Sequence, residues 1–140
     1  HEDTRCKCVA WDATPERTCF VGEHEGYVRL SPPVLHRRSL ELKKISRQLS
    51  IKDEVIPRAA STIPPLTWSF VLHPDCDVQI NRGGARIQRN GREIRFEASQ
   101  GDWLHHETFF APAYGVRENT NVLRLFHRPG VTEQSFLISW

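Results

Sequence analysis

The sequence has no methionine, and none of its apolar runs approaches the roughly 18 residues that a membrane-spanning helix needs. No charged-then-apolar leader opens the chain. Because the sequence starts at His1 and contains no methionine, we interpret it as a processed protein or a piece of a longer one. Charge of one sign is also scarce, because 19 Lys and Arg side chains stand against 17 Asp and Glu side chains, a formal net charge of +2. This balance lacks the field that attracts duplex nucleic acid or an anionic membrane, and we expect neither as a partner.

Cysteine is sparse: the four residues of this type are Cys6, Cys8, Cys19 and Cys76. They are too few for a disulfide-dense scaffold and do not form two Cys-x-x-Cys pairs. Cys6 and Cys8 would share one face of a strand, with Cys19 on the neighbouring strand. This placement leaves open a zinc site with a histidine, a disulfide from Cys19 to Cys6 or Cys8, and ordinary packing as small apolar side chains. We assign no metal ligand from these residues.

What the sequence does contain is a β-strand pattern. Helical periodicity is nearly absent, whereas short β-forming runs broken by Gly, Pro, Asn and Asp recur about every 8 to 12 residues. We predict a single all-β domain over residues 1–140, an antiparallel β-sandwich of stacked sheets with about ten short strands. The expected strands are approximately Arg5–Trp11, Arg17–Tyr27, Leu35–Lys43, Gln48–Ile56, Thr67–His73, Val78–Asn81, Ala85–Arg89, Arg92–Ala98, Trp103–Phe109, Val122–His127 and Glu133–Ser139.

Two hairpins can be tested by pairing their residues. The first turns at Asn90-Gly91, a dipeptide that tolerates the positive φ angles of a two-residue turn. Counting outward from that turn places apolar pairs on one face and polar pairs on the other, as a half-buried antiparallel hairpin requires. The apolar pairs are Ile87 with Ile94 and Ala85 with Phe96.

The second hairpin connects its strands through the segment Lys43–Gln48. Its inner face pairs leucine with leucine or isoleucine, and the same register gives each of two arginines a carboxylate partner. The agreement of apolar and ionic pairing supports this register. The pairs are Leu42 with Leu49, Leu40 with Ile51, Arg38 with Asp53 and Arg37 with Glu54.

The common catalytic motifs, namely the dinucleotide fingerprint, the P-loop, HExxH and GxSxG, are missing from the sequence. A histidine near a tyrosine, as in the segment Gly22–Tyr27, is what proton abstraction from an acidic sugar carbon needs. On the expected strand, His24 and Tyr27 differ by three positions and point to opposite faces, so one flat strand would not bring both to one substrate. We keep His24 and Tyr27 as candidate substrate-binding residues beside the alternative of a polar strand end.

Arginines are the other functional signal, because five of them occur within residues 82–95. The first hairpin sets Arg86 opposite Arg95, and like charges in that position are unfavourable. A uronate or sulfated sugar would relieve the repulsion by bidentate contacts, so Arg86 and Arg95 are further candidate substrate-binding residues. The alternative is that Glu93 and Glu97 already neutralise the pair.

Several short segments, in this order, resemble the C-terminal β-domain of the heparinase II/III-like polysaccharide lyases. That family has a His-acid-Gly-Tyr element, a His-Arg-Arg strand, an Asp ending the return strand, an apolar strand closing in His-Pro and a late Tyr-Gly. The resemblance extends over nearly the whole chain and depends on order and spacing. The matching segments are Gly22–Leu30, His36–Leu40, Leu49–Glu54, Phe70–Pro74 and Ala113–Val116.

This resemblance implies a β-sandwich that packs, in the full enzymes, against an N-terminal α/α-toroid. Those enzymes are eliminative lyases: a base removes the C5 proton of a uronic acid, and the 4-linked sugar leaves. The chain would be the distal C-terminal portion, a scaffold and one wall of the cleft for an acidic polysaccharide such as a glycosaminoglycan. The chain would be inactive alone, since the His-Asn-Thr element that usually precedes this region is missing, and no catalytic residue or metal ligand is carried over. The full enzyme would act without a nucleotide or redox cofactor.

The resemblance also favours a periplasmic or cell-envelope location. Two alternatives are a stand-alone carbohydrate-binding or protein-docking module that uses the Arg86 and Arg95 face, and a purely structural domain.

Overall fold

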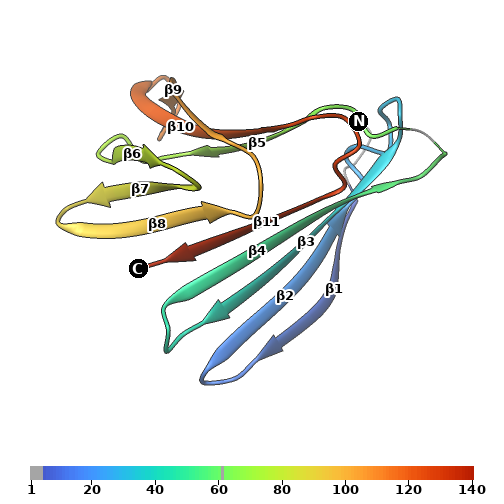
Figure 1. The fold of residues 1–140 in the computed structure, drawn as a ribbon, viewed down its shortest axis with the longest axis horizontal. Helices are drawn as coiled ribbons and strands as arrows, with labels where there is room; N and C mark the ends of the chain where they lie inside the picture. Colours follow the sequence, from blue (N-terminus) through green and yellow to red (C-terminus); the bar gives the residue numbers. More distant parts are fainter. Residues whose placement is uncertain (1–4, 61) are drawn as a thin grey trace.

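The computed structural model describes residues 5–60 and 62–140, which form eleven β-strands. The strands are arranged in two antiparallel sheets, one of order β1-β2-β3-β4-β11-β8-β7-β6 and one of order β5-β10-β9 (Figure 1). The predicted all-β antiparallel class is confirmed. The described residues contain no helix long and apolar enough to cross a membrane. The strands are β1 (Cys6–Ala13), β2 (Arg17–His24), β3 (Val34–Lys43), β4 (Gln48–Pro57), β5 (Leu66–Val71), β6 (Asp77–Asn81), β7 (Gly84–Arg89), β8 (Arg92–Ala98), β9 (Trp103–Phe110), β10 (Glu118–His127) and β11 (Glu133–Ser139).

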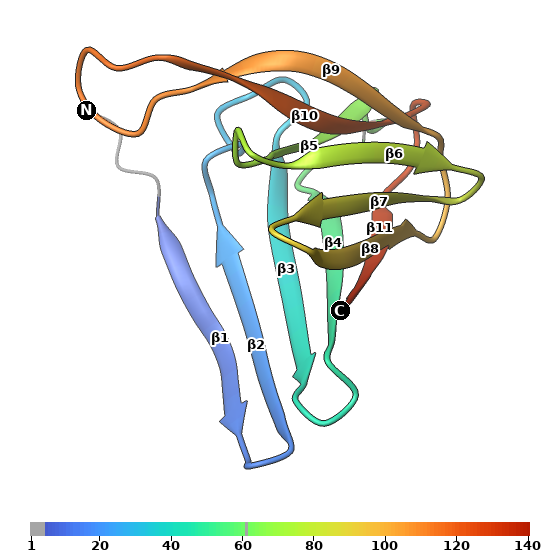
Figure 2. The same ribbon diagram turned by 90° about the vertical axis from the view of Figure 1, so that its left-hand side faces the viewer.

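The large sheet bends sharply along its length. In Figure 2, β6, β7 and β8 run nearly crosswise to the long strands β1 to β4. β11 joins the two parts, because it pairs with β4 along its whole length and with β8 through its last residues. The small sheet lies over the β6–β8 part, while β1, β2 and β3 extend away from it (Figures 1 and 2). As a result, every residue of β1 is exposed.

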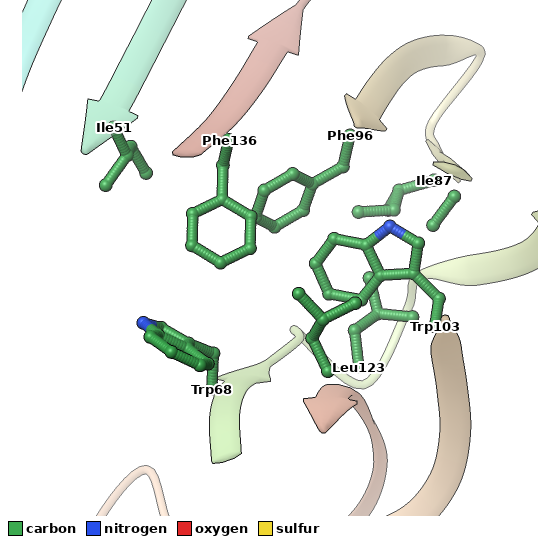
Figure 3. Close-up of a cluster of buried hydrophobic side chains, with 9 residues drawn as sticks. Ile51, Trp68, Ile87, Phe96, Trp103, Leu123 and Phe136 are labelled. Carbon is green, nitrogen blue, oxygen red and sulfur yellow. The ribbon is translucent and has the colours of Figure 1, made fainter. Parts of the chain in front are cut away.

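The core fills the space between the two sheets with aromatic and aliphatic side chains (Figure 3). Phe70 stands edge-on to Phe96 and Phe136, with ring centroids 4.7 and 5.1 Å away, an arrangement that aromatic quadrupoles favour. Trp68 and Trp103 are buried members of this cluster, so they are not available as platforms for a sugar ring. The buried members are Ile51, Trp68, Ala85, Ile87, Phe96, Trp103, Leu123, Leu125 and Phe136.

Both predicted hairpins have the predicted register. In the first, Asn90 and Gly91 have positive φ angles of 50° and 73°, as a two-residue turn between twisted strands requires. Ala85 and Phe96 are buried as predicted, whereas Ile94, closer to the turn, is 38% exposed.

In the second hairpin the four predicted pairs are opposite one another, and Arg38 makes its ion pair with Asp53. The ionic partner predicted for Arg37 is wrong. Arg37 lies opposite Glu54, but its guanidinium binds Glu23 on β2 instead, with Nε 2.8 Å from Oε1. A central strand has neighbours on both sides, and Lys52 already lies 3.8 Å from Glu54.

The cysteines do not form the disulfide that the sequence left open. Cys19 lies opposite Asp12, whereas Cys6 and Cys8 lie opposite His24 and Gly22 at the other end of β2. None of the four cysteines, all of which the structure describes, is in a disulfide. Residues 5–60 and 62–140 also contain no group of three or more His, Cys, Asp or Glu side chains placed to hold a metal ion.

Candidate functional site

The predicted strand Arg17–Tyr27 ends three residues early, at His24, and this changes the geometry of the candidate site. The backbone turns after Glu25, whose carbonyl accepts a hydrogen bond from the N–H of Val28 at 3.0 Å. The turn returns Tyr27 to His24, with ring centroids 5.0 Å apart in an edge-on arrangement. The prediction that His24 and Tyr27 point to opposite faces is therefore wrong, because it assumed an extended backbone through Tyr27.

Asp53 on β4 lies beside these residues and is completely buried. Arg38 donates to both carboxylate oxygens, from Nε and from Nη2, at 2.7 Å each. His36 Nε2 lies 2.9 Å from Oδ1, and Trp68 Nε1 donates to Oδ2 at 2.9 Å. Burial alone would raise the pKa of Asp53, but the hydrogen bonds from Arg38 and His36 outweigh it and lower the pKa to about 2. The carboxylate is therefore ionised at neutral pH.

His36 extends the hydrogen bonding from Asp53 to His24. The two residues lie directly opposite each other on β3 and β2, and His36 Nδ1 is 2.8 Å from His24 Nε2. The N–H of Gly26 in the turn donates to His24 Nδ1 at 3.3 Å. Burial first, and then electrostatic interaction with His36 and Arg38, lower the pKa of His24, so its imidazole is neutral at pH 7. We call His24, His36, Arg38, Asp53 and Trp68 the Asp53 cluster.

A groove of about 520 Å³ runs along the Asp53 cluster, between the β2–β3 turn and β5. Apolar side chains form much of its wall, and Tyr27 and Arg38 are among the polar residues that line it. The Tyr27 side chain is 47% exposed and that of Arg38 39%. Among the described residues, no acceptor bonds to the remaining nitrogen of Arg38, Nη1, and no partner bonds to the Tyr27 hydroxyl. Tyr27 and Arg38 therefore retain bonding capacity at the wall of the groove.

The other two candidates, Arg86 and Arg95, lie on a different surface. They are opposite each other as predicted, on the face of β7 and β8 that points away from the core. Glu93 lies between them, with carboxylate oxygens 3.5 Å from Nε of each arginine. A hydrogen bond from Gln88 and then the charge of Arg86 lower the pKa of Glu93, so it is ionised beside them. The fold does not bring this arginine pair to the Asp53 cluster.

Four members of the Asp53 cluster were not among the predicted site residues, namely His36, Arg38, Asp53 and Trp68. The first three could have been found from the sequence. Their signal was present in the alternation of β3 and β4, because His36 and Arg38 occupy the same face as the apolar residues that follow them. Charged side chains on an inner face must be paired, which marks them as a polar site within a core-facing row. Trp68 left no such signal, since its bond to Asp53 depends on how the two sheets pack.

Comparison with known proteins agrees with this architecture. The family described as Heparinase II/III-like, C-terminal, matches residues 6–140, and the chain belongs to this family. The crystal structure of the heparan sulfate lyase HepC from Pedobacter heparinus superposes with a TM-score of 0.78 at 12% identity, over 96% of this chain and 21% of that one. A heparinase III gene product gives a TM-score of 0.77 at 16% identity, over 99% of this chain and 22% of that one.

At these identities the two solved structures establish a shared fold. The present chain spans about a fifth of their length, so it corresponds to one part of a much larger protein in each case. A search of curated proteins gives no significant match.

Proposed function

We propose that this domain is one wall of the cleft that binds an acidic, uronate-containing polysaccharide in a larger lyase acting by β-elimination. The family supports this proposal, as do the names of the solved relatives, a heparan sulfate lyase and a heparinase III. Within this proposal the chain supplies binding and scaffold surfaces, and the upstream part of the protein supplies the catalytic groups. The isolated chain is then inactive.

The observation that carries the proposal is the groove beside the Asp53 cluster. Two bonds from Arg38 to Asp53 hold the guanidinium rigidly at the wall of the groove, through Nε and Nη2. A planar guanidinium held in this way suits the carboxylate of a uronic acid. The phenol of Tyr27 adds a hydroxyl donor and an aromatic face for the sugar ring. Both ring nitrogens of His24 are already hydrogen-bonded, to Gly26 and to His36, so they are not free to bind a ligand. The role of His24 is to pack against the Tyr27 ring.

The proposed covalent partner is an N-terminal α/α-toroid domain of the same protein. The exposed part of the large sheet fits such a partner, because Trp11 on β1 is 65% exposed and stacks edge-on against Phe20 of β2. Aromatic side chains gathered on an uncovered sheet face mark a surface that another domain covers.

The test measures the ultraviolet absorbance of unsaturated uronates. The 140-residue chain and a longer protein that includes the upstream sequence are each mixed with heparan, alginate and hyaluronan fragments. A signal from the longer protein alone supports the proposal. A signal from the short chain would show that the domain is itself catalytic, and no signal from either would remove the lyase assignment for these glycans.

Binding by the groove is tested with Tyr27→Phe, which removes one hydroxyl and keeps the ring. We expect about five-fold weaker binding of uronate oligomers, the usual effect of one lost hydrogen bond. Tyr114→Phe is the matched control, because Tyr114 is fully exposed on the loop between β9 and β10, and it should bind as the wild type does. Equal affinities in all three proteins would place the glycan elsewhere.

The second candidate function is a stand-alone carbohydrate-binding module that uses Arg86 and Arg95. One observation favours it: the Arg95 side chain is 68% exposed, and a single carboxylate, Glu93, serves both arginines. This function predicts salt-sensitive binding by the isolated chain that disappears in a variant with Arg86→Ala and Arg95→Ala. Unchanged binding in that variant would eliminate it.

A further inference from the structure

The bond from Gly26 determines which ring nitrogens of His24 and His36 are donors and which are acceptors. Because the N–H of Gly26 donates to His24 Nδ1, that nitrogen is an acceptor and the ring proton of His24 is on Nε2. His24 Nε2 therefore donates to His36 Nδ1, and the proton of His36 must be on its Nε2. His36 Nε2 in turn donates to Asp53 Oδ1. We call this series, from Gly26 through His24 and His36 to Asp53, the hydrogen-bond relay.

The relay has no place for an additional proton. A proton added to His24 goes on Nδ1, where it would face the N–H of Gly26, and two donors cannot bond to each other. A proton added to His36 goes on its Nδ1, where it faces the N–H of His24. The conflict is removed only if the His24 proton moves to Nδ1, which again opposes Gly26. Every route to a charged imidazole pair in this geometry therefore breaks the bond from Gly26.

Gly26 directly precedes Tyr27, so this bond controls the residue that faces the groove. The carbonyl of Tyr27 accepts the N–H groups of Leu30 and Val34, at 3.1 and 3.3 Å, which makes the backbone of Tyr27 part of the same turn. The Tyr27 ring rests on His24. Losing the acceptor at His24 Nδ1 thus removes support for both the backbone and the ring.

We propose that Asp53, His36 and His24 are positioning residues that hold Tyr27 at the groove only while both imidazoles are neutral, so that acidification releases the turn. The consequence for glycan affinity, weaker binding at acid pH, depends on the proposed function. The release of the turn on acidification does not depend on the proposed function.

The titratable and charged groups around His24 come from each neighbouring element. β3 contributes His36 and Arg38, β4 contributes Asp53, β1 contributes the thiol of Cys6 opposite His24, and the turn contributes Glu25 and Tyr27. Arg38 and Asp53 form a closed ion pair, so their charges largely offset each other. Because burial lowers the pKa of His24 below its ordinary 6.5, the release is expected on the acid side of that value.

The test uses the fact that the chain has only two tyrosines, Tyr27 and Tyr114. Fluorotyrosine is incorporated, and two fluorine resonances are followed by NMR from about pH 8 to about pH 5. The fully exposed Tyr114 is an internal reference, and Tyr114→Phe assigns the two signals. We expect the Tyr27 resonance to move toward the position of Tyr114 on acidification, with a midpoint below 6.5. A Tyr27 resonance that stays constant while the histidines titrate would overturn the proposal.

His24→Asn is the critical variant, because the amide oxygen of asparagine accepts a hydrogen bond near the position of Nδ1 but does not titrate. Its Tyr27 resonance should keep its neutral-pH position down to about pH 5. His106→Gln on β9 is the matched control, since His106 is exposed and far from the turn, and it should show the full wild-type change. A pH-dependent shift in His24→Asn equal to that of the wild type would contradict the relay.

If His24→Asn fails to fold, the wild type alone still decides the question. Nitrogen-15 shifts of the imidazole rings report which nitrogen carries the proton, and the amide shift of Gly26 reports its hydrogen bond. The proposal requires protonation of His24 and the change at Gly26 to share one midpoint. A heparan oligomer titration at the two pH values then tests the link to binding separately: an unchanged affinity beside a moving Tyr27 resonance would refute the groove and leave the relay intact.

Discussion

The Asp53 cluster and the arginine pair of the β7–β8 hairpin contain the same chemical groups in different surroundings. In both, a carboxylate pairs with an arginine of a neighbouring strand, Asp53 with Arg38 and Glu93 with Arg86. Asp53 is fully buried and bonded at 2.7 Å, whereas the Glu93 side chain is 34% exposed and lies 3.5 Å from each arginine. Water screens both partners of the second group of charges, whereas in the first group it reaches Arg38 but not the buried carboxylate.

The difference teaches which of the two surfaces is rigid. A buried carboxylate must have all of its bonds satisfied, so Asp53 fixes the positions of His36, Arg38 and Trp68 together. Arg86 and Arg95 have no such constraint and gain little from Glu93. A preorganised guanidinium binds a ligand with less loss of entropy than a mobile one, which favours the groove at Arg38 over the hairpin as a glycan site.

The largest effect is expected from Asp53→Asn. This change keeps the shape of the side chain but removes the charge that Arg38 and His36 bond to, in a buried position. We expect a loss of about 3 kcal/mol in the free energy of unfolding, measured by urea denaturation. Glu54→Gln, one residue later on β4, is the control on the exposed face. A loss for Asp53→Asn no larger than that for Glu54→Gln would show that the cluster does not stabilise the fold.

Acid should remove part of the same stabilisation in the wild type. The pKa of Asp53 is about 2 in the folded chain against an ordinary 3.8, so the unfolded chain binds the proton more readily. The resulting contribution, about 2 kcal/mol, is complete above pH 3.8 and is lost as pH falls toward 2. Denaturation curves between these two pH values should show the difference between wild type and Asp53→Asn shrinking. A constant difference would contradict the lowered pKa.

A smaller effect is expected from Arg38→Lys, since lysine keeps the charge but cannot bond both oxygens of Asp53. We expect a loss of about 1.5 kcal/mol by thermal or urea denaturation. Arg37→Lys is a matched comparison, because Arg37 is the adjacent residue on the opposite face and its partner, Glu23, is only half-buried. Arg37→Lys should cost clearly less; equal losses would mean that burial does not separate the two faces.

The smallest effect is expected from Glu93→Gln in the arginine hairpin. Removing the charge leaves Arg86 and Arg95 facing each other in water, where salt screens their repulsion. The melting temperature should change little at physiological salt and fall slightly at low salt. A large loss at both salt concentrations would show that the exposed pair stabilises the hairpin as the buried one stabilises the site.

The pattern of apolar and polar residues was sufficient to predict the strands approximately and the registers of two hairpins. Alternation of apolar and polar residues has a period of two, so a single turn position such as Asn90-Gly91 determines every pair that follows. The same counting places Arg38 opposite Asp53 and Arg86 opposite Arg95, as in the fold. These features depend only on residues that are close along the chain.

The site itself depended on contacts between segments that are distant along the chain. Whether β2 stopped at His24 or continued to Tyr27 was decided by bonds from the turn to β1 and β3, which no local propensity contains. The partner of Arg37 depended on which strands lie on each side of β3, because β2 offers Glu23 and β4 offers Glu54.

The sequence by itself therefore determined the all-β class, the hairpin registers and the ion pair between Arg38 and Asp53, because these follow from local periodicity and turn chemistry. Only the tertiary structure decided that Tyr27 returns to His24, that His24 bonds to His36, and that Trp68 from the second sheet completes Asp53. The physical reason is burial: when the sheets pack, every polar group that loses water must find a partner, wherever in the chain that partner lies.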